Sequence, residues 1–188
     1  MSDETERLEE QVKAAARDDQ ALPPIEKWDP ELSGDIDILI ARDGVWHHEG
    51  KPLGRESIAR LFSTILRRED DGHYYLITPV EKWRLRVEDT PLVAHTLQVE
   101  GSGKQQKLYV TTNVGERLLI GRDHPLEVGS YDSDGSPRPV VRVRRGLEAR
   151  LVTTAYYELA DLMVEKAAAD STVLGVWSDD EFFELGNG

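Results

Sequence analysis

Residues 34–48 read GDIDILIARDGVWHH, in which isoleucines at every second position precede one tight-turn dipeptide. Its three isoleucines fall on one face of an extended chain, because successive side chains of a strand point to opposite faces. Asp43-Gly44 is a strong signal for a short hairpin turn, and residues 45–48 supply the returning strand. The stretch therefore predicts a β-hairpin with one buried face.

The chain continues from this hairpin into an amphipathic pattern. From Arg55 onward, apolar residues recur at helical spacing as far as Leu66, which predicts a helix ending near residues 70–72. Residues 74–78 predict the next strand. Residues 82–129 alternate apolar and polar side chains between Gly-, Asn- and Pro-bearing breaks, which predicts a run of short antiparallel strands.

The last third of the chain repeats these signals. Asp134-Gly135 predicts another hairpin, and Gly146 precedes a long helix that we predict from Leu147 to about Ala168. Residues 173–177 then predict a strand, and a final edge strand is predicted at residues 181–185.

Two segments of the predicted helices align at one constant offset. Residues 59–64 read ARLFST and residues 149–154 read ARLVTT, so four of the six positions are identical. Each copy follows an Asp-Gly hairpin and precedes a strand, which predicts an internal duplication of a hairpin–helix–strand lobe. The alternative is that two amphipathic helices have converged on similar surfaces.

The predicted fold class is α+β, with mainly antiparallel sheet in two related lobes at residues 23–88 and 89–188. Residues 1–22 form an acidic N-terminal segment, helical or flexible, in which a thin apolar stripe predicts a marginal helix over residues 3–17. A seam between duplicated lobes is a usual place for a small-molecule site, so we expect a ligand there.

The composition narrows the class of protein. The chain of 188 residues has a net charge of −13, which argues against indiscriminate binding to nucleic acid or anionic membranes. The lack of cysteine excludes disulfides and thiolate metal sites and fits a reducing compartment. The acidic start has no apolar core of a secretory signal, and no apolar run approaches the roughly 20 residues that cross a bilayer. We therefore expect a cytoplasmic protein without nucleic-acid or membrane partners.

Arginines precede both predicted helices. Arg55 opens the first helix, and Arg144 and Arg145 stand before the second. Helix N-termini present free N–H groups and partial positive charge, so an arginine placed there points to a bound anion. The alternative is a structural ion pair with a neighbouring carboxylate, for which Glu56 and Glu148 are close enough in sequence.

Other candidate groups carry weaker signals. Asp35 and Asp37 lie on one strand face, where paired carboxylates can hold a metal or share a proton, although a solvated strand face is the more common use. Together with His124 they define a hydrolase hypothesis, which requires all three to meet in one cleft. Glu158 falls among the apolar positions of the second predicted helix, so we expect an arginine or a tyrosine hydroxyl to meet it.

An ordered set of motifs carries a resemblance to a known family. The motifs are Gly34–Asp37, Arg42–Trp46, Leu61–Arg68, Thr78–Lys82, Val87–Asp89, Thr112-Asn113, His124–Leu126, Arg144–Ala149 and Gly175–Ser178. In this order, the chain from about residue 23 to 185 resembles the bacterial domain-of-unknown-function family numbered 1285. The departure is Pro91-Leu92, where an aromatic residue after the proline is more usual.

The resemblance implies a duplicated α+β core whose C-terminal lobe is pleckstrin-homology-like. It also implies a ligand site at the lobe interface, for a nucleotide-based molecule, and a role in bacterial signalling. No catalytic activity, metal or cofactor is implied.

These observations lead to one hypothesis and two alternatives. We expect a non-catalytic protein that binds an anionic, nucleotide-like small molecule; the alternatives are a protein–protein interaction module and a hydrolase that uses acidic residues. The residues expected to bind the ligand are Arg55, Arg60, Lys82, Thr112, Asn113, His124, Arg144 and Arg145.

Overall fold

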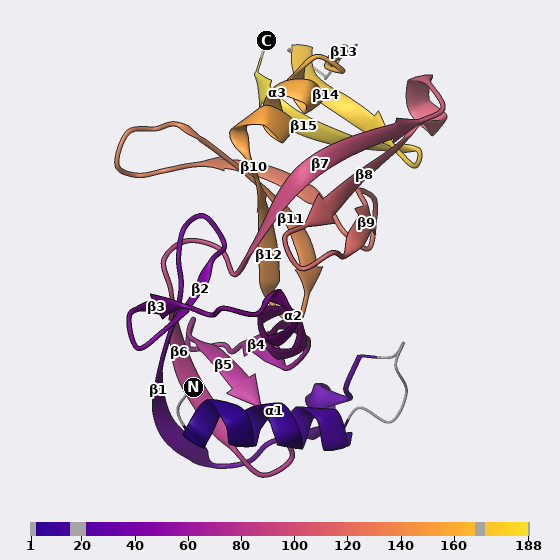
Figure 1. Cartoon of the computed structure of the whole chain (residues 1–188). Coiled ribbons are helices and arrows are strands. Elements are labelled where there is room, and N and C mark those ends of the chain that lie inside the picture. Colours follow the sequence, from indigo (N-terminus) through magenta and orange to yellow (C-terminus); the bar gives the residue numbers. More distant parts are fainter. Residues whose placement is uncertain (1–2, 16–21, 168–171, 188) are drawn as a thin grey trace. The chain divides into compact units, whose positions relative to one another are not determined.

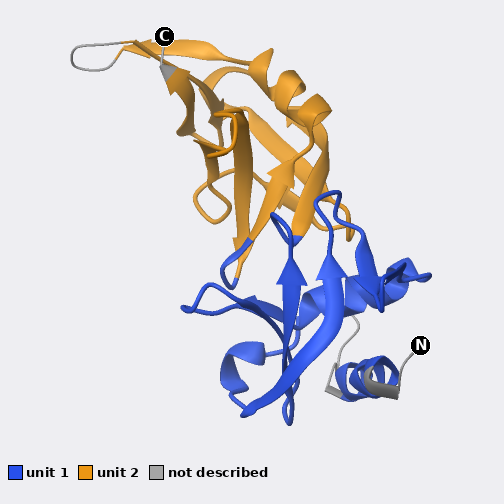
Figure 2. Ribbon diagram, turned by 90° about the vertical axis from the view of Figure 1, so that its left-hand side faces the viewer, with its two compact units in different colours: residues 1–91, 145–147 blue, residues 92–144, 148–188 orange. Residues whose placement is uncertain are grey.

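The computed structural model of the chain describes residues 3–15, 22–167 and 172–187, which fall into two compact units (Figure 2). Unit 1 comprises residues 1–91 together with 145–147, and unit 2 comprises residues 92–144 and 148–188. The boundary predicted from the sequence lay after residue 88, three residues before the observed boundary, and the prediction placed residues 145–147 in the second lobe. Each unit is described by itself below.

Unit 1 contains a six-stranded sheet in the order β3-β2-β1-β6-β5-β4 (Figure 1). Its elements are α1 (Asp3–Ala15), the 3-10 helix η1 (Ile25–Lys27), β1 (Leu32–Ile40), β2 (Trp46–His48), β3 (Lys51–Pro52), α2 (Glu56–Thr64), β4 (Leu66–Arg68), β5 (Tyr74–Ile77) and β6 (Lys82–Val87). The two central strands, β1 and β6, run parallel, and all other neighbours are antiparallel.

The hairpin predicted from residues 34–48 is confirmed as β1 and β2. Gly44 takes a φ of 84°, which glycine adopts without steric strain, and the Asp43 carboxylate accepts a hydrogen bond from the N–H of Val45 at 3.0 Å. The isoleucines of β1 are 0–3 % exposed and form the apolar face of the sheet. The aspartates that alternate with them lie on the opposite, polar face of the sheet. Leu39, near the end of β1, is the first apolar residue of the strand on that face.

Helix α2 packs on the apolar face of unit 1. Its Ile58 and Phe62 are buried, and the Phe62 ring centroid lies 6.3 Å from that of Trp46 in β2. The predicted helix was too long, since Leu66 already belongs to β4. The hydroxyls of Ser63 and Thr64 donate to backbone carbonyls three residues earlier at 2.7 and 2.6 Å, a local arrangement that weakens the helix, and strand pairing with β5 then takes over.

The N-terminal helix α1 contacts α2. Its narrow apolar stripe is fully used, because Leu8 and Val12 are 0 % and 1 % exposed. The carboxylate of Glu81 adds a polar attachment, accepting from Arg7 at 2.8 Å and from Gln11 at 3.2 Å. Residues 16 and 17 of the predicted helix lie outside the described residues.

The turn at residues 145–147 belongs to unit 1 because it pairs with the edge of the sheet. Arg145 and Gly146 have φ values of 51° and 74°, which give the tight two-residue turn of a hairpin. The N–H of Arg68 in β4 donates to the carbonyl of Arg145 at 3.1 Å. A Cβ at Gly146 would lie 3.1 Å from the Cβ of Arg68, so glycine permits this close approach.

Unit 2 contains a six-stranded sheet in the order β10-β11-β12-β7-β8-β9 and a three-stranded sheet in the order β13-β14-β15. Its elements are β7 (Leu92–Glu100), η2 (Gly103–Gln105), β8 (Lys107–Thr112), β9 (Arg117–Leu119), β10 (Leu126–Ser130), β11 (Pro137–Arg144), β12 (Leu147–Leu151), α3 (Thr153–Ala160), β13 (Val164–Ala167), β14 (Thr172–Ser178) and β15 (Glu181–Asn187).

The two six-stranded sheets share one topology, so the fold is α+β with duplicated lobes, mainly antiparallel as predicted. In each sheet the chain starts at a central strand, moves outward over three strands, and returns from the opposite edge to end beside its starting strand. That last strand is parallel to the first in both sheets, as β6 is to β1 and β12 to β7. Strands β1 to β6 therefore correspond in order to β7 to β12.

The alignment predicted between residues 59–64 and 149–154 is wrong. Residues 149–151 belong to strand β12, whereas residues 59–64 belong to helix α2. The helices also occupy different places, since α2 joins the third and fourth strands of its sheet and α3 follows the sixth strand. The similarity of ARLFST and ARLVTT is thus a coincidence of sequence rather than the register of the duplication.

The long helix predicted from Leu147 to about Ala168 is also wrong; Ala168 lies outside the described residues, and the described part is β12, α3 and β13. Leu147, Ala149 and Leu151 are buried and their two intervening residues are half-buried, a period of two that fits a strand. Pairing with β7 overrides the helical propensity of this stretch.

The pleckstrin-homology-like character of the C-terminal lobe stays a prediction. No helix within residues 3–15, 22–167 and 172–187 is long and apolar enough to cross a membrane.

Candidate functional site

The polar face of the unit 1 sheet holds a hollow of about 700 Å³ over β1, β6 and the start of β5. We call it the charged hollow and define it by five of its lining residues, Asp35, Asp37, His73, Arg84 and Arg86. Its volume lies in the range of small-molecule sites, although such sites are usually more apolar. The aspartates come from β1 and the arginines from β6, which lie side by side in the sheet (Figure 1), and His73 directly precedes β5.

Two ion pairs cross the charged hollow between the parallel strands β1 and β6. The guanidinium of Arg84 donates to both carboxylate oxygens of Asp35, at 2.6 and 2.9 Å, and Arg86 donates to Asp37 at 2.9 Å. The first pair follows from the strand register, in which Asp35 lies opposite Arg84; Arg86 lies opposite Leu39 and reaches the neighbouring Asp37 on the same face. A column of two carboxylates therefore stands beside a column of two guanidinium groups.

The electrostatics of the charged hollow favour the ionised form of Asp35. The hydrogen bonds from Arg84 hold the pKa of Asp35 below its usual range, and the positive potential of Arg84 and His73 acts in the same direction. The four side chains of the two pairs are 40–70 % exposed. Ion pairs this exposed contribute little to stability, so the arrangement can be opened at little cost.

A second network lies on the same face beside β4 and β5. Glu69 accepts from Arg67 at 2.5 Å and from Lys82 at 3.3 Å. Burial opposes ionisation of Glu69, but these hydrogen bonds outweigh it and lower the pKa of the carboxyl. Arg67 also donates to the carbonyls of Ile25 and Trp28, at 3.1 and 3.3 Å, and so holds the η1 segment against the sheet.

The hydroxyl of Tyr75 donates to the carboxylate of Asp71 at 2.6 Å, and this bond, together with burial, raises the pKa of Tyr75 to about 12. Between pH 10 and about 12 the folded chain then keeps a proton that the unfolded chain has lost. We expect stability to fall as pH rises through this window. Tyrosine-labelled NMR should show Tyr75 titrating near 12, and Asp71→Ala should return it towards 10. Equal titration of Tyr75 in both proteins would contradict the assignment.

With this geometry in place, the chain can be compared with known proteins. The model of the N-terminal domain of the family described as a domain of unknown function (DUF1285) matches residues 23–90, and that of its C-terminal domain matches residues 91–185. The chain belongs to the DUF1285 family.

Two solved structures of the family are similar to this chain. A DUF1285 family protein from Silicibacter pomeroyi DSS-3 is 40 % identical, with 94 % of each chain covered and a TM-score of 0.82. A DUF1285 family protein from Shewanella baltica OS155 is 29 % identical, covers 67 % of this chain and 91 % of its own, and has a TM-score of 0.53. No curated protein matches the chain.

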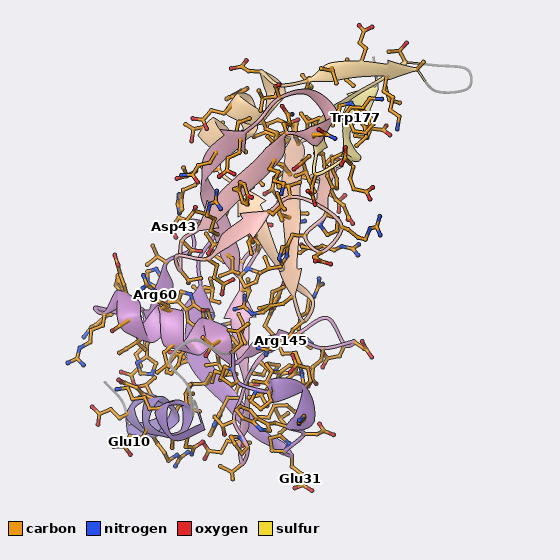
Figure 3. All side chains as sticks on the ribbon, turned by 90° about the vertical axis from the view of Figure 1, so that its right-hand side faces the viewer. Glu10, Glu31, Asp43, Arg60, Arg145 and Trp177 are labelled. Atoms are coloured by element: carbon orange, nitrogen blue, oxygen red, sulfur yellow. The ribbon has the colours of Figure 1, made fainter. Side chains whose placement is uncertain are left out.

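In this DUF1285 member, the predicted ligand-binding residues of unit 1 do not form one site. Arg55 is the N-cap residue of α2, and Arg60 lies on the exposed side of the same helix (Figure 3). Neither guanidinium has an ion pair within the described part of the chain. Lys82 is engaged with Glu69. The prediction that Arg145 opens a helix is wrong, because it lies in the turn between β11 and β12.

Arg145 is instead a structural residue with a side chain only 9 % exposed. It forms an ion pair with Glu26 and donates to the carbonyls of Thr64 and Pro23, at 2.8 and 2.7 Å. Its hydrogen bond lowers the pKa of Glu26. Arg67, from strand β4, and Arg145, from the turn between β11 and β12, thus both hold the segment around η1.

The predicted residues of unit 2 are also engaged within their own unit. The Thr112 hydroxyl accepts from the N–H of Glu116 at 3.1 Å, and the Asn113 side chain accepts from the N–H of Val93 at 3.1 Å. Arg144 forms an ion pair with Glu116, and His124 Nδ1 lies 3.1 Å from the carbonyl oxygen of Arg142. The ligand site expected at the junction of the lobes stays a prediction.

The hydrolase hypothesis required Asp35, Asp37 and His124 to meet in one cleft. Asp35 and Asp37 line the charged hollow, where each binds an arginine, while His124 bonds to Arg142 and is not among the lining residues. Among the described residues, no group of three or more histidines and carboxylates could hold a metal ion. Glu158, expected on an apolar face, is exposed, because α3 buries Ala155 and Leu159 instead.

Sequence reasoning did not single out Arg84, Arg86 or His73. A signal was present, since Arg-x-Arg in β6 has the same spacing as Asp-x-Asp in β1. Its use required knowing that these two strands are neighbours, which the sequence does not state.

Proposed function

We propose that this DUF1285 protein is a non-catalytic binding protein that takes a small anionic ligand in the charged hollow. The observation that carries the proposal is the pair of guanidinium groups on β6, held side by side in a concave surface and partly exposed. Guanidinium groups bind carboxylates and phosphates through two parallel hydrogen bonds. The bonds of Arg84 to Asp35 already have this bidentate form.

The ligand would enter by exchange rather than by filling an empty site. Its anionic group takes the place of a carboxylate on Arg84 or Arg86, and the released Asp35 or Asp37 accepts from a cationic or hydrogen-bond-donating group of the ligand. Because ion pairs this exposed contribute little to stability, this exchange costs little. A nucleotide fits the description, since it combines a phosphate with amino donors on its base.

A binding role fits these residues better than catalysis. A general base works best with a pKa near the working pH, whereas the hydrogen bonds of Arg84 depress the pKa of Asp35. A protein that binds a nucleotide-like ligand without converting it would act as a sensor, which is the signalling role included in this proposal.

The test is calorimetric titration of the full chain with nucleoside phosphates, cyclic dinucleotides and flavin mononucleotide, each beside the phosphate-free nucleoside or riboflavin. The double variant Arg84→Gln/Arg86→Gln should weaken binding by roughly 10-fold or more, as expected for lost hydrogen bonds to a charged group. The double variant Asp35→Asn/Asp37→Asn should bind inorganic phosphate more tightly, because it removes the carboxylates that compete for the guanidinium groups.

A matched control removes two ion-paired arginines from unit 2. Arg117→Gln/Arg122→Gln changes the net charge equally, and both residues lie in exposed ion pairs. Equal weakening by both arginine variants, or no heat with any compound of the panel, would overturn the proposal.

A further inference from the structure

The three-stranded sheet of unit 2 carries an aromatic pair on its outer face. Trp177 in β14 lies directly opposite Phe182 in β15, with ring centroids 5.2 Å apart and planes at 60°. The neighbouring residues Val176 and Ser178 point to the other face and are fully buried. Trp177 and Phe182 are half-buried, so the sheet presents both rings at its surface.

Two lysines lie over these rings. The ammonium of Lys104, in η2, is 4.9 Å from the centroid of Trp177. The ammonium of Lys166, in β13, is 5.3 Å from the centroid of Trp177 and 4.7 Å from that of Phe182. We call these four residues the aromatic platform; Figure 3 labels Trp177.

The charge of the aromatic platform is unusual for this chain. Acidic residues outnumber basic ones by 36 to 23, yet neither Lys104 nor Lys166 has an acidic partner within residues 3–15, 22–167 and 172–187. Both ammonium groups instead lie over aromatic rings, an interaction that is weak at exposed sites. Each sits on a flexible four-carbon stem and can move to a better partner.

We propose that the aromatic platform binds a small planar aromatic anion. The ring of the ligand stacks on Trp177 beside Phe182, whose plane is tilted by 60° from that of Trp177, and the carboxylate or phosphate of the ligand pairs with the ammonium groups of Lys104 and Lys166. Charge complementarity favours a small ligand, because two lysines match one or two negative charges. A polyanion such as single-stranded nucleic acid also stacks on aromatic residues, but it is repelled by the net charge of −13.

This site is separate from the charged hollow, so it goes beyond the function proposed above. The hollow offers guanidinium groups and carboxylates but no tryptophan. The platform offers rings and ammonium groups on residues of unit 2 alone. The two therefore differ in the ligands they select.

The test is an NMR titration of the full chain that follows the indole N–H of Trp177, assigned by its loss in Trp177→Phe. Phenyl phosphate is the probe, with inorganic phosphate and phenol as the charge-only and ring-only comparisons. We expect phenyl phosphate to shift the Trp177 signal in a saturable way, with at least 10-fold weaker response to either comparison compound. The double variant Lys104→Gln/Lys166→Gln should bind phenyl phosphate roughly 10-fold more weakly.

The control is Arg84→Gln/Arg86→Gln, which should leave the Trp177 response unchanged even where it abolishes binding in the charged hollow. The lysine variants keep both rings, so a retained Trp177–Phe182 contact in their spectra shows that the sheet is folded. An equal response to phosphate, phenol and phenyl phosphate, or unchanged affinity in the lysine variant, would overturn the proposal and leave the lysines a purely structural role.

Discussion

Replacing Gly175 by alanine is expected to destabilise unit 2 by about 3 kcal/mol, at the upper end of the usual penalty for overpacking. A Cβ at this position would lie 2.3 Å from the carbonyl oxygen of Phe183 and 2.6 Å from Cζ of Phe182. The first atom is backbone in the paired strand and cannot rotate away. Strand β15 also holds an irregularity here, since Leu174 pairs with Gly186 and Gly175 with Glu184.

Gly186→Ala is the matched control for this substitution. Gly186 lies in the same strand pair, but a Cβ there would meet no atom within 4 Å. Thermal unfolding of the two variants beside the unchanged chain measures the difference. Similar melting temperatures for both variants would show that the close approach of β14 and β15 is not needed for stability.

Arg145→Asn is expected to destabilise unit 1 by about 3 kcal/mol, because two carbonyls and one carboxylate lose a charged hydrogen-bond donor. Asparagine is chosen because Asn-Gly is well suited to a turn in which both residues have positive φ. The variant therefore keeps the turn favourable and removes only the contacts of the guanidinium. Chemical denaturation gives the change in the free energy of unfolding.

Two controls separate the parts of this effect. Glu26→Gln removes the ion pair while keeping the carbonyl bonds, and it should change stability by less than about 1 kcal/mol, because Glu26 is 61 % exposed. Arg122→Asn removes an arginine that is 87 % exposed. If Arg145→Asn is no more disruptive than Arg122→Asn, the segment around η1 does not depend on Arg145.

The two substitutions show where interpretation of the sequence reached its limit. Arg145 was expected to bind a ligand because it seemed to open a helix, and Gly175 was only part of a family motif. In the structure, Gly175 acts through the paired strand β15, and Arg145 acts through residues far away in the chain, such as Pro23. A contact over that distance leaves no periodic pattern in the sequence.

The charged hollow illustrates the same limit. That Asp35 and Asp37 share a face follows from alternation alone, as predicted. Their partners each lie 49 residues further along the chain, on strand β6, which runs parallel to β1 with a shift of register between Asp35 and Leu39. The sequence predicted both strands without indicating that they are neighbours.

The sequence by itself determined what depends on neighbouring residues: the hairpin at residues 34–48, the short alternating strands and the family. These follow from turn geometry and from the period of side chains along a strand, which act over a few residues. Tertiary structure alone decided that residues 147–151 form a strand, that the duplicated sheets match β1 to β7, and that Arg84 and Arg86 meet two aspartates. The physical reason is that strand pairing joins distant segments, and its hydrogen bonds and burial outweigh the weak local preferences of the chain.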